Sequence, residues 1–203
     1  TRLSHSQGLV ELGERQVPDD IPYVRDAAKY VMMPANAIRR HVAVEARMKR
    51  MAEDASGLPI NRAEYRDLSV GFITSGIPYQ YVREAMPDAS VLKLGLVHPL
   101  PRRLIEEFAS KVDKLYIFEE LEPVIEEQVK AWGIQKAVGK ELFTIQGEYS
   151  ANMIRTRVLG EKLDEMEPAK IPARPPILCP GCPHRSVFSV LSRLKIHAAG
   201  DIG

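Results

Sequence analysis

The sequence predicts an α/β fold built on a Rossmann-like parallel sheet in residues 66–150. Compact apolar runs rich in β-branched residues alternate there with helix-like segments of about ten residues. Prolines and glycines stand between the runs and mark their ends. Strands that alternate with helices in this way form βαβ units, and helices then cover both faces of the parallel sheet.

The elements of this domain follow one another from residue 68. The run LSVGFITS predicts the first strand, and GIPYQYVREAM predicts a loop that enters a helix. The run SVLKLGLV predicts the second strand, and RRLIEEFASKV predicts a helix whose inward residues are Leu104, Ile105, Phe108 and Val112. The run KLYIFEE predicts the third strand, followed by a helix in EPVIEEQVKAWG that ends at Gly133. The run LFTIQG is the expected last strand.

The segment before this domain is expected to be a helical linker, residues 19–65. One helix-like stretch begins at Asp20, whose side chain would cap it, and a second follows Pro34 and ends at Gly57. The second helix is long and has an apolar stripe and a basic face. The basic face is interpreted as solvated, with a binding role as the alternative. The stripe consists of Ile38, Val42, Ala46 and Met48 or Met51, and the basic face of Arg39, Arg40, Arg47, Lys49 and Arg50.

The segment after the domain, residues 151–176, is expected to form one more helix and then a proline-rich extended linker. A new segment begins at residues 177–203, with a two-cysteine loop, a helix in HRSVFSVLSRLK and a short strand in IHAAGDIG. Because the sequence stops on loop-like residues directly after this strand, the chain is expected to be a piece of a longer protein.

Charge and composition exclude several classes of function. The formal net charge is +1, which offers no electrostatic case for binding nucleic acid or an acidic membrane surface. Hydrophobic residues make up 45% and charged residues 27%, which is typical of a globular protein. No apolar run approaches the roughly 18 residues of a membrane span, and two cysteines form no disulfide scaffold. A cytoplasmic location is therefore expected.

The stretch ILCPGCPHRSVF, residues 177–188, holds both cysteines and leaves four interpretations open. A structural zinc needs four ligands, and the sequence offers one Cys-x-x-Cys pair with His184 nearby. A redox dithiol would be activated by the start of a helix, and the pair does precede one. Buried structural cysteines in a tight turn are the third interpretation. The fourth is a loop shaped to hold a ligand.

The ligand interpretation depends on two loops. Pro183 suits the first turn of a helix, so the free amides that follow would point back toward the cysteine loop and favour a phosphate. Arg185 adds a fixed positive charge beside them. The sequence GDIG lies just past an expected strand, and α/β proteins bind ligands at the carboxyl ends of strands. The two loops are therefore expected to border one pocket for a diphosphate-bearing cofactor.

The sequence CPGCPHRSVFSVL, followed by GDIG, resembles the opening of the diphosphate-binding domain of the thiamine diphosphate-dependent 2-oxoacid:ferredoxin oxidoreductases. The proline–histidine pair after the second cysteine is most similar to the branch that acts on indolepyruvate and other aryl 2-oxo acids. The sequence TRLSHSQGLVELGER resembles the tail of the family's pyrimidine-binding domain, here residues 1–18. Residues 66–150 resemble the transketolase C-terminal-like domain, which in the family mainly packs the subunits together.

The resemblance implies an oxidative decarboxylation. In the family, a 2-oxo acid, coenzyme A and ferredoxin give an acyl-CoA, carbon dioxide and reduced ferredoxin, and a beta subunit is the partner. It also implies thiamine diphosphate, Mg2+ and [4Fe-4S] clusters in the full-length protein, and no cofactor bound to this chain alone. The residues that match the family's cofactor-binding loops are Cys179, Gly181, Cys182, His184, Arg185, Gly200, Asp201 and Gly203.

The residues that catalyse the reaction in the family are expected outside this chain. The family's catalytic glutamate lies upstream of Thr1, and its magnesium-binding Gly-Asp motif lies downstream of Gly203. Asp201 belongs to an earlier loop, so it is not expected to be the metal ligand. The 203-residue chain alone is therefore expected to be inactive.

A non-enzymatic module that binds a ligand or another subunit through its Rossmann-like domain is the alternative function. The turn TSGIPY joins a strand to a helix, but it lacks the glycine pattern and the lysine of nucleotide-binding loops. Glu119, Glu120 and Glu122 cluster beyond the third strand, at a sheet edge where sites occur, although a solvated helix start explains them equally well. His98 is expected to be a turn residue.

Overall fold

The computed structural model describes residues 8–164, 172, 178 and 180–199. The chain divides into two compact units, Thr1–Lys162 and Leu163–Gly203. The first unit contains a sheet and most of the helices, and the described residues of the second unit contain one helix. None of the helices in the described residues is both long and apolar enough to cross a membrane.

A five-stranded sheet forms the centre of the first unit. The order across the sheet is β1-β3-β2-β4-β5. β2 pairs in parallel with β3 and β4, and β4 pairs in parallel with β5, whereas β1 is antiparallel to β3. The expected α/β fold with a mainly parallel sheet is confirmed. The strands are β1 (Arg62–Glu64), β2 (Asp67–Ser75), β3 (Ala89–Leu94), β4 (Lys114–Phe118) and β5 (Ala137–Val138).

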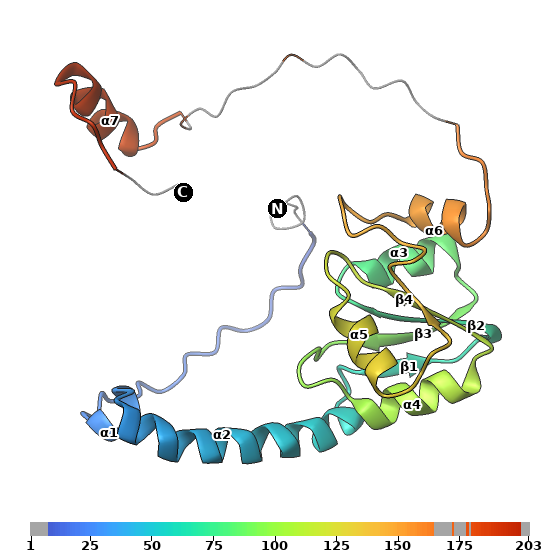
Figure 1. Cartoon of the computed structure of the whole chain (residues 1–203). Coiled ribbons are helices and arrows are strands. Elements are labelled where there is room, and N and C mark those ends of the chain that lie inside the picture. Colours follow the sequence, from blue (N-terminus) through green and yellow to red (C-terminus); the bar gives the residue numbers. More distant parts are fainter. Residues whose placement is uncertain (1–7, 165–171, 173–177, 179, 200–203) are drawn as a thin grey trace. The chain divides into compact units, whose positions relative to one another are not determined.

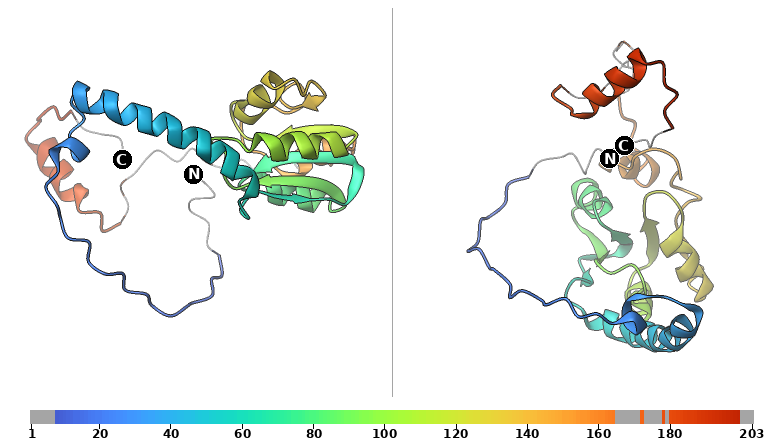
Figure 2. Two further views of the ribbon diagram at one scale, coloured as in Figure 1. Left: turned by 90° about the horizontal axis from the view of Figure 1, so that it is seen from below. Right: turned by 90° about the vertical axis from the view of Figure 1, so that its left-hand side faces the viewer.

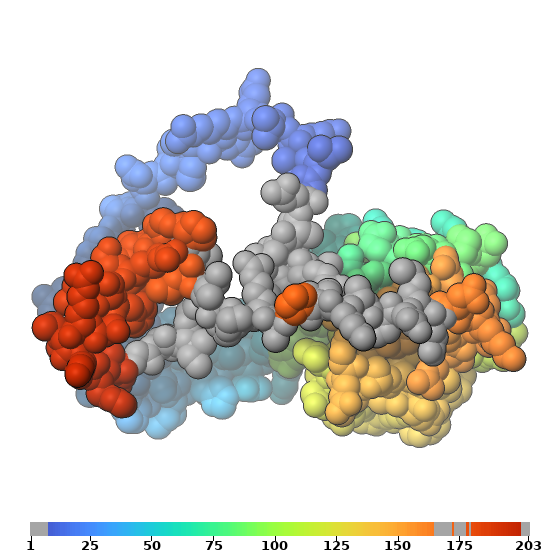
Figure 3. Space-filling model, turned by 90° about the horizontal axis from the view of Figure 1, so that it is seen from above, coloured from blue at the N-terminus to red at the C-terminus, as the bar shows by residue number. Residues whose placement is uncertain are grey.

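Helices cover both faces of this sheet (Figure 1). They are α3 (Pro78–Ala85), α4 (Arg102–Lys111), α5 (Val124–Ala131) and α6 (Ala151–Arg157). α3 and α6 pack against each other on one face, and α4 and α5 lie along the other. In the space-filling view of Figure 3, the green atoms around α3 adjoin the orange atoms around α6.

The two faces of the sheet have separate cores because successive side chains of a strand point to opposite faces. In β2, Phe72 packs on the face covered by α3 and α6, and Ile73 packs on the face covered by α4 and α5. Both side chains are fully buried, as are Ile105 and Phe108 of α4, which the helical spacing predicted to point inward. Each such burial stabilises the fold by about 1.5–3 kcal/mol.

The prediction of a strand in residues 142–147 is wrong. The last strand of the sheet in the described residues is β5, whose two residues pair with Leu115 and Tyr116 of β4. Residues 142–147 form turns and bends instead, and Phe143 enters the core with its ring centroid 4.9 Å from that of Phe118. A loop anchored by one buried aromatic residue can have the composition of a short strand. The pattern of apolar residues in the sequence therefore did not distinguish this loop from a strand.

Strand β1 lies in residues that were expected to be part of the helical linker. Its sequence, Arg-Ala-Glu, has no apolar alternation, and its place in the sheet depends on the residue before it. Asn61 accepts hydrogen bonds from the amides of Gly95 and Leu96 at 2.8 and 2.9 Å, and it donates one to the carbonyl oxygen of Ala55 at 2.8 Å. A buried side-chain amide therefore fixes the edge strand against the loop after β3.

A short helix, α1 (Ala27–Tyr30), precedes the long one. Oδ1 of Asp26 caps α1 by accepting a hydrogen bond from the amide of Lys29 at 3.0 Å. The prediction that a helix begins at Asp20 is wrong, because residues 8–26 have no regular structure. Pro22 disfavours helical backbone at the residue before it, which explains why the helix does not begin there.

The long helix expected before the domain is confirmed as α2 (Pro34–Asp54), and Gly57 ends the short 3-10 helix η2 (Ala55–Gly57) that follows it. Figure 2 shows α2 as one continuous helix. Its apolar stripe is not covered by the described residues, since Ile38 and Val42 are 69% and 72% exposed. The stripe is therefore an open surface of the first unit. Most helices in proteins depend on packing of their apolar face for their stability.

The second unit contains α7 (His184–Arg193), as the sequence predicted. The strand expected in IHAAGDIG is wrong for its described part, because residues 196–199 have no regular structure. A lone strand is stable when it has ladder partners, and none lies in the described residues of this unit. The apolar face of α7 is open as well, with Val187 and Leu194 58% and 62% exposed.

A charged cluster around Glu64 joins β1 to α3. The hydroxyl of Tyr79 donates to Oε1 of Glu64 at 2.9 Å, and Arg62 and Arg83 form ion pairs with the same carboxylate. Burial opposes ionisation of Glu64, but the hydrogen bonds from Tyr79 and Arg83 outweigh it. The pKa of Glu64 therefore lies below its ordinary value of 4.5.

The variant Glu64→Gln is expected to be less stable than the native protein by about 1 kcal/mol at neutral pH, and by less in acid. A carboxyl group whose pKa is lowered by folding contributes stability above its unfolded pKa, and this contribution is lost as the pH falls through the folded pKa. Urea denaturation of both proteins from about pH 7 to about pH 3 measures the difference. A difference that stays constant across this range would contradict the assignment.

Candidate functional site

The described part of the cysteine loop forms a turn that leads directly into α7. Gly181 has φ 77°, a left-handed conformation that favours glycine. Sγ of Cys182 lies 3.3 Å from Nδ1 of His184, and the amide of Arg185 donates to the carbonyl oxygen of Cys182 at 3.1 Å. The helix begins at His184, directly after Pro183, and none of the described side chains caps its first turn.

Two features of this turn favour a negatively charged group. The first amides of an uncapped helix point out of its N-terminus, where the helix dipole favours negative charge. Arg185 lies in that first turn and adds a guanidinium group. The structure therefore brings Gly181, Cys182, His184 and Arg185 together at one helix end.

The other half of the expected pocket lies outside the described residues. Cys179, Gly200, Asp201 and Gly203 belong to that half. The prediction that the cysteine loop and the GDIG loop border one pocket therefore stays a prediction. So do the zinc and dithiol interpretations, because both require Cys179. Within the described residues, no three His, Cys, Asp or Glu side chains gather in a way that could hold a metal ion.

The carboxyl edge of the sheet carries a buried carboxylate. Glu119 directly follows β4 and is 6% exposed. Its Oε2 accepts a hydrogen bond from the amide of Ile125, and its Oε1 accepts one from the amide of Glu126, each at 2.9 Å. These amides belong to the first turn of α5, so the Glu119 side chain caps that helix and complements its dipole.

The loop of residues 139–150 is fastened to the same edge. The ammonium group of Lys140 donates to the carbonyl oxygen of Glu119 and, at 2.8 Å, to the hydroxyl of Tyr149. The Tyr149 hydroxyl donates to the carbonyl oxygen of Thr144 at 2.8 Å, and the Tyr149 amide donates to Oε1 of Glu120 at 3.0 Å. These bonds hold the loop and the end of β4 as one rigid group. We call Glu119, Glu120, Lys140, Thr144 and Tyr149 the edge group.

Burial shifts the pKa values of this group. It raises the pKa of Glu119 and lowers that of Lys140. Burial, followed by the negative charges of Glu119, Glu120 and Glu126, raises the pKa of Tyr149 to about 12. Tyr149 therefore keeps its proton at neutral pH, which its hydrogen bond to Thr144 requires.

A cavity of about 500 Å3 opens at this edge. It lies where the turn from β2 into α3 meets the turn from β4 into α5, and these two helices cover opposite faces of the sheet. In open α/β sheets this position is the usual ligand crevice. The cavity is lined by Ser75, Gly76, Ile77, Pro78, Val97, Glu119, Glu120, Leu121, Glu122, Val124 and Ile125.

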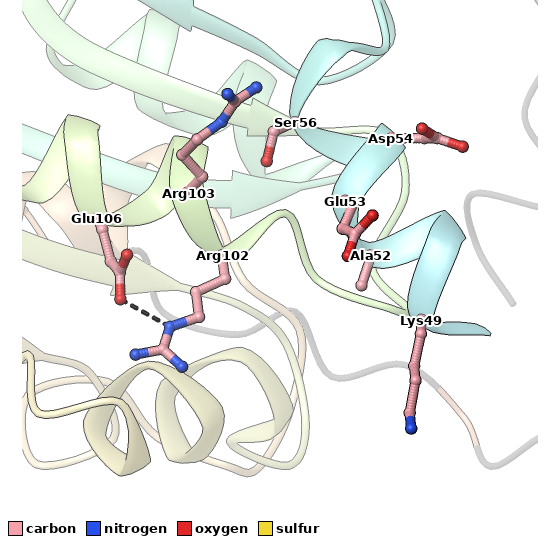
Figure 4. Close-up of a pocket in the computed structure, with 8 residues that line it drawn as sticks. All are labelled: Lys49, Ala52, Glu53, Asp54, Ser56, Arg102, Arg103 and Glu106. Atoms are coloured by element: carbon pink, nitrogen blue, oxygen red, sulfur yellow. Dashed lines mark hydrogen bonds and ion pairs between the residues drawn. The ribbon is translucent and has the colours of Figure 1, made fainter. Parts of the chain in front are cut away.

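A second cavity, of about 600 Å3, lies between the end of α2 and the start of α4 (Figure 4). Nε of Arg102 is ion-paired with Oε1 of Glu106 at 2.7 Å. The guanidinium group of Arg102 also lies 5.5 Å from the centre of the Trp132 ring. Charges of both signs line this cavity, so it has no clear preference for a charged ligand. They are Lys49, Arg102 and Arg103 against Glu53, Asp54 and Glu106.

Sequence reasoning identified part of the edge group and missed the rest. Glu119 and Glu120 do lie at the site, and His98 lies in a bend, as expected. Lys140 and Tyr149 were missed because they lie in a segment without helical or strand periodicity. The available signal was an aromatic residue in a polar loop, which is often buried with its hydroxyl hydrogen-bonded.

Comparison with known proteins finds relatives over the whole chain. No family model matches. The chain is 33% identical over 224 residues to the indolepyruvate oxidoreductase subunit IorA of Archaeoglobus fulgidus, covering 99% of this chain and 36% of that protein. It is 33% identical to the IorA subunit of Thermococcus kodakarensis and 34% identical to that of Methanothermobacter marburgensis. Each of these matches covers 100% of this chain, with 36% and 35% of the relative, respectively.

The chain thus spans about a third of the length of the curated relatives it matches. Among solved structures, the 2-oxoglutarate:ferredoxin oxidoreductase from Magnetococcus marinus, with 2-oxoglutarate, coenzyme A and succinyl-CoA bound, is similar over 64% of this chain and 24% of its own. The sequence identity is 21% and the TM-score is 0.47.

Proposed function

The chain belongs to the family of indolepyruvate oxidoreductase IorA subunits, and we propose that it is the central part of a subunit that oxidatively decarboxylates 2-oxo acids. The observation that carries this proposal is the match to IorA subunits over 99% of the chain or more. The proposed order of segments is a pyrimidine-domain tail (1–18), a mainly helical linker that ends in strand β1 (19–65), the α/β domain (66–150), a second linker (151–176) and the start of the diphosphate-binding domain (177–203).

The proposed substrates are indolepyruvate and other aryl 2-oxo acids, in keeping with the name of the relatives. The bond between the carboxylate and keto carbons breaks, and the acyl group passes to coenzyme A. The [4Fe-4S] clusters of the full-length protein would carry the two electrons of the oxidation to ferredoxin. The products are aryl-acetyl-CoA, carbon dioxide and reduced ferredoxin. The proposed partner is the beta subunit of the same cytoplasmic enzyme.

The proposed cofactor residues lie at the start of the diphosphate-binding domain. These residues would hold thiamine diphosphate, with Mg2+ in the full-length protein, and the cofactor would supply the chemistry that cleaves a 2-oxo acid. The uncapped start of α7, with Arg185 in its first turn, fits a diphosphate group. His184 and Asp201 are the proposed polar contacts, and the loop residues that shape the pocket are Cys179, Gly181, Cys182, Gly200 and Gly203.

The proposed activity is tested on the full-length subunit produced together with its beta subunit. Coenzyme A-dependent reduction of ferredoxin is measured with indolepyruvate, phenylpyruvate and 2-oxoglutarate. Indolepyruvate and phenylpyruvate are expected to be preferred. A preference for 2-oxoglutarate would overturn the aryl assignment, and inactivity with all three would overturn the proposed function.

The variant Arg185→Ala of the full-length subunit is expected to bind thiamine diphosphate about tenfold more weakly, because one charge-assisted hydrogen bond to the diphosphate is lost. Isothermal titration calorimetry measures the change. The matched control is Arg193→Ala, which removes the same side chain from the other end of α7 and is expected to leave the affinity unchanged. Equal effects of the two variants would contradict the proposed position of the cofactor.

The 203-residue chain alone is expected to bind thiamine diphosphate at least about tenfold more weakly than the full-length subunit, and to show no turnover. The reason is that it contains about a third of the length of its relatives and the loops of one half-site. Calorimetry on both proteins in the presence of Mg2+ measures the difference. Equal affinities would place the complete cofactor site within this chain.

A further inference from the structure

We propose that the cavity at the carboxyl ends of β2 and β4 binds an organic cation with an apolar body, such as a primary amine on an aromatic or aliphatic group. The described residues that line the cavity belong to the first unit, whereas the cysteine loop belongs to the second unit. Its position, its walls and its charge each contribute to this assignment.

The position is the point where the sheet changes the direction of its connections. β2 leads through α3 to β3 on one side, and β4 leads through α5 to β5 on the other. The turns after β2 and β4 therefore separate and leave a crevice between them. The volume of about 500 Å3 lies within the usual range for small-molecule sites.

The walls of the cavity are mainly apolar and partly open to water. Leu121, Val124 and Val97 are 66%, 63% and 42% exposed, and the buried Ile125 adjoins them. Large apolar side chains gathered around a hollow favour a ligand that offers apolar surface. The body of the ligand is therefore expected to be a hydrocarbon or an aromatic ring.

The charge at the cavity is negative. Glu119, Glu120 and Glu122 are the charged residues among the described residues that line it. Lys140 offsets part of this charge, but its ammonium group is bound to the carbonyl oxygen of Glu119 and the hydroxyl of Tyr149. Glu120 is held in place by the amide of Tyr149. A cationic group is attracted to the carboxylates, whereas a phosphate is repelled, which argues against a nucleotide at this edge.

The backbone presents two of these carboxylates on either side of one strained residue. Leu121 has φ 61°, a left-handed conformation that is uncommon for a side chain of this kind. The Leu121 side chain is exposed, and its neighbours in sequence, Glu120 and Glu122, line the cavity with it. The rim thus combines an apolar contact with two acceptors for an ammonium group.

The test uses the full 203-residue chain and three probes of nearly equal shape: 2-phenylethylamine, 2-phenylethanol and phenylacetate. Binding is followed by NMR through the methyl groups of Val97, Leu121 and Val124. The amine is expected to give saturable shifts of these methyl groups, and the alcohol to bind about threefold to fivefold more weakly. Phenylacetate is expected not to bind, because the carboxylates repel it.

Three variants separate the contribution of the carboxylates from that of the apolar cavity. Glu120→Gln and Glu122→Gln keep the shape of the side chains and are each expected to weaken binding of the amine about threefold to fivefold. Val124→Trp fills the cavity from an exposed position and is expected to abolish binding of all probes. Glu127→Gln, on α5 but outside the cavity, is the matched control and is expected to change nothing.

Three results would overturn the proposal. They are equal affinities for the three probes, an amine affinity unchanged in Glu120→Gln and Glu122→Gln, and the absence of saturable binding up to about 10 mM amine. Shifts confined to residues outside the cavity count as the last of these three results, because they show no binding at this site.

Discussion

Replacing Gly71 with valine is expected to lower the free energy of unfolding by about 3 kcal/mol, at the upper end of the cost of overpacking a core. Gly71 lies in β2, between β3 and β4, and faces α4. A Cβ atom at this position would lie 2.8 Å from both Cγ atoms of Val112 and 3.0 Å from Cε1 of Phe108. Both neighbours are buried, so neither can move away without disturbing the core.

Urea denaturation of the 203-residue chain measures this loss. The control is Gly57→Val, because a Cβ atom at Gly57 would meet no described atom within 4 Å. Its free energy of unfolding is expected to stay within about 0.5 kcal/mol of the native value. The double variant Gly71→Val, Val112→Ala is expected to lose less stability than the sum of the single variants, since Val112→Ala removes both clashing atoms. Additive losses would show that the clash is not the cause.

The α/β domain could be predicted from the sequence because its elements bury residues with a regular period. In α4, Ile105 and Phe108 are buried as the helical spacing predicted, as is Val112 at its C-cap, and Leu104 is partly buried. In β2, a continuous apolar run corresponds to a strand covered on both faces. Periodicity is a reliable signal wherever a whole face of an element packs against the core.

Short elements were missed for the opposite reason. β1 and β5 are three and two residues long, so neither offers a pattern to detect. Their positions depend on partners far along the chain: Lys93 is the pairing partner of Arg62, and Leu115 that of Ala137. Tertiary contacts of this kind leave no local signal in the sequence.

The candidate cofactor loop shows a different limit. The residue types around Gly181 predicted a turn followed by a helix, and both are present. The expected cofactor pocket, however, is bordered by two loops, and the GDIG loop lies outside the described residues. Local chemistry predicts a loop, but joining two loops into a pocket depends on how a complete domain packs.

Replacing Glu119 with alanine is expected to destabilise the α/β domain by about 2–4 kcal/mol, because two buried amides at the start of α5 lose their acceptor. The positive charge of Lys140 also favours this carboxylate, although the hydrogen bond of Lys140 goes to the backbone carbonyl oxygen of Glu119 and is kept in the variant. Chemical denaturation measures the loss. Glu122→Ala is the control: it removes an exposed glutamate three residues away, and its effect is expected to be below about 0.5 kcal/mol. Similar losses for the two variants would rule out the capping role.

The stability that Glu119 contributes is expected to fall as the pH rises. Burial raises the pKa of Glu119 above its ordinary value of 4.5, so the folded protein holds this proton to higher pH than the unfolded chain does. The stability that this carboxyl group contributes is therefore greatest below its unfolded pKa, and part of it is lost as the pH rises through the folded pKa. Glu119→Gln does not titrate, so the advantage of the native protein over this variant should shrink from about pH 4 to about pH 7. An advantage that grows over this range would mean that the two amide hydrogen bonds outweigh burial and that the carboxylate is the favoured form.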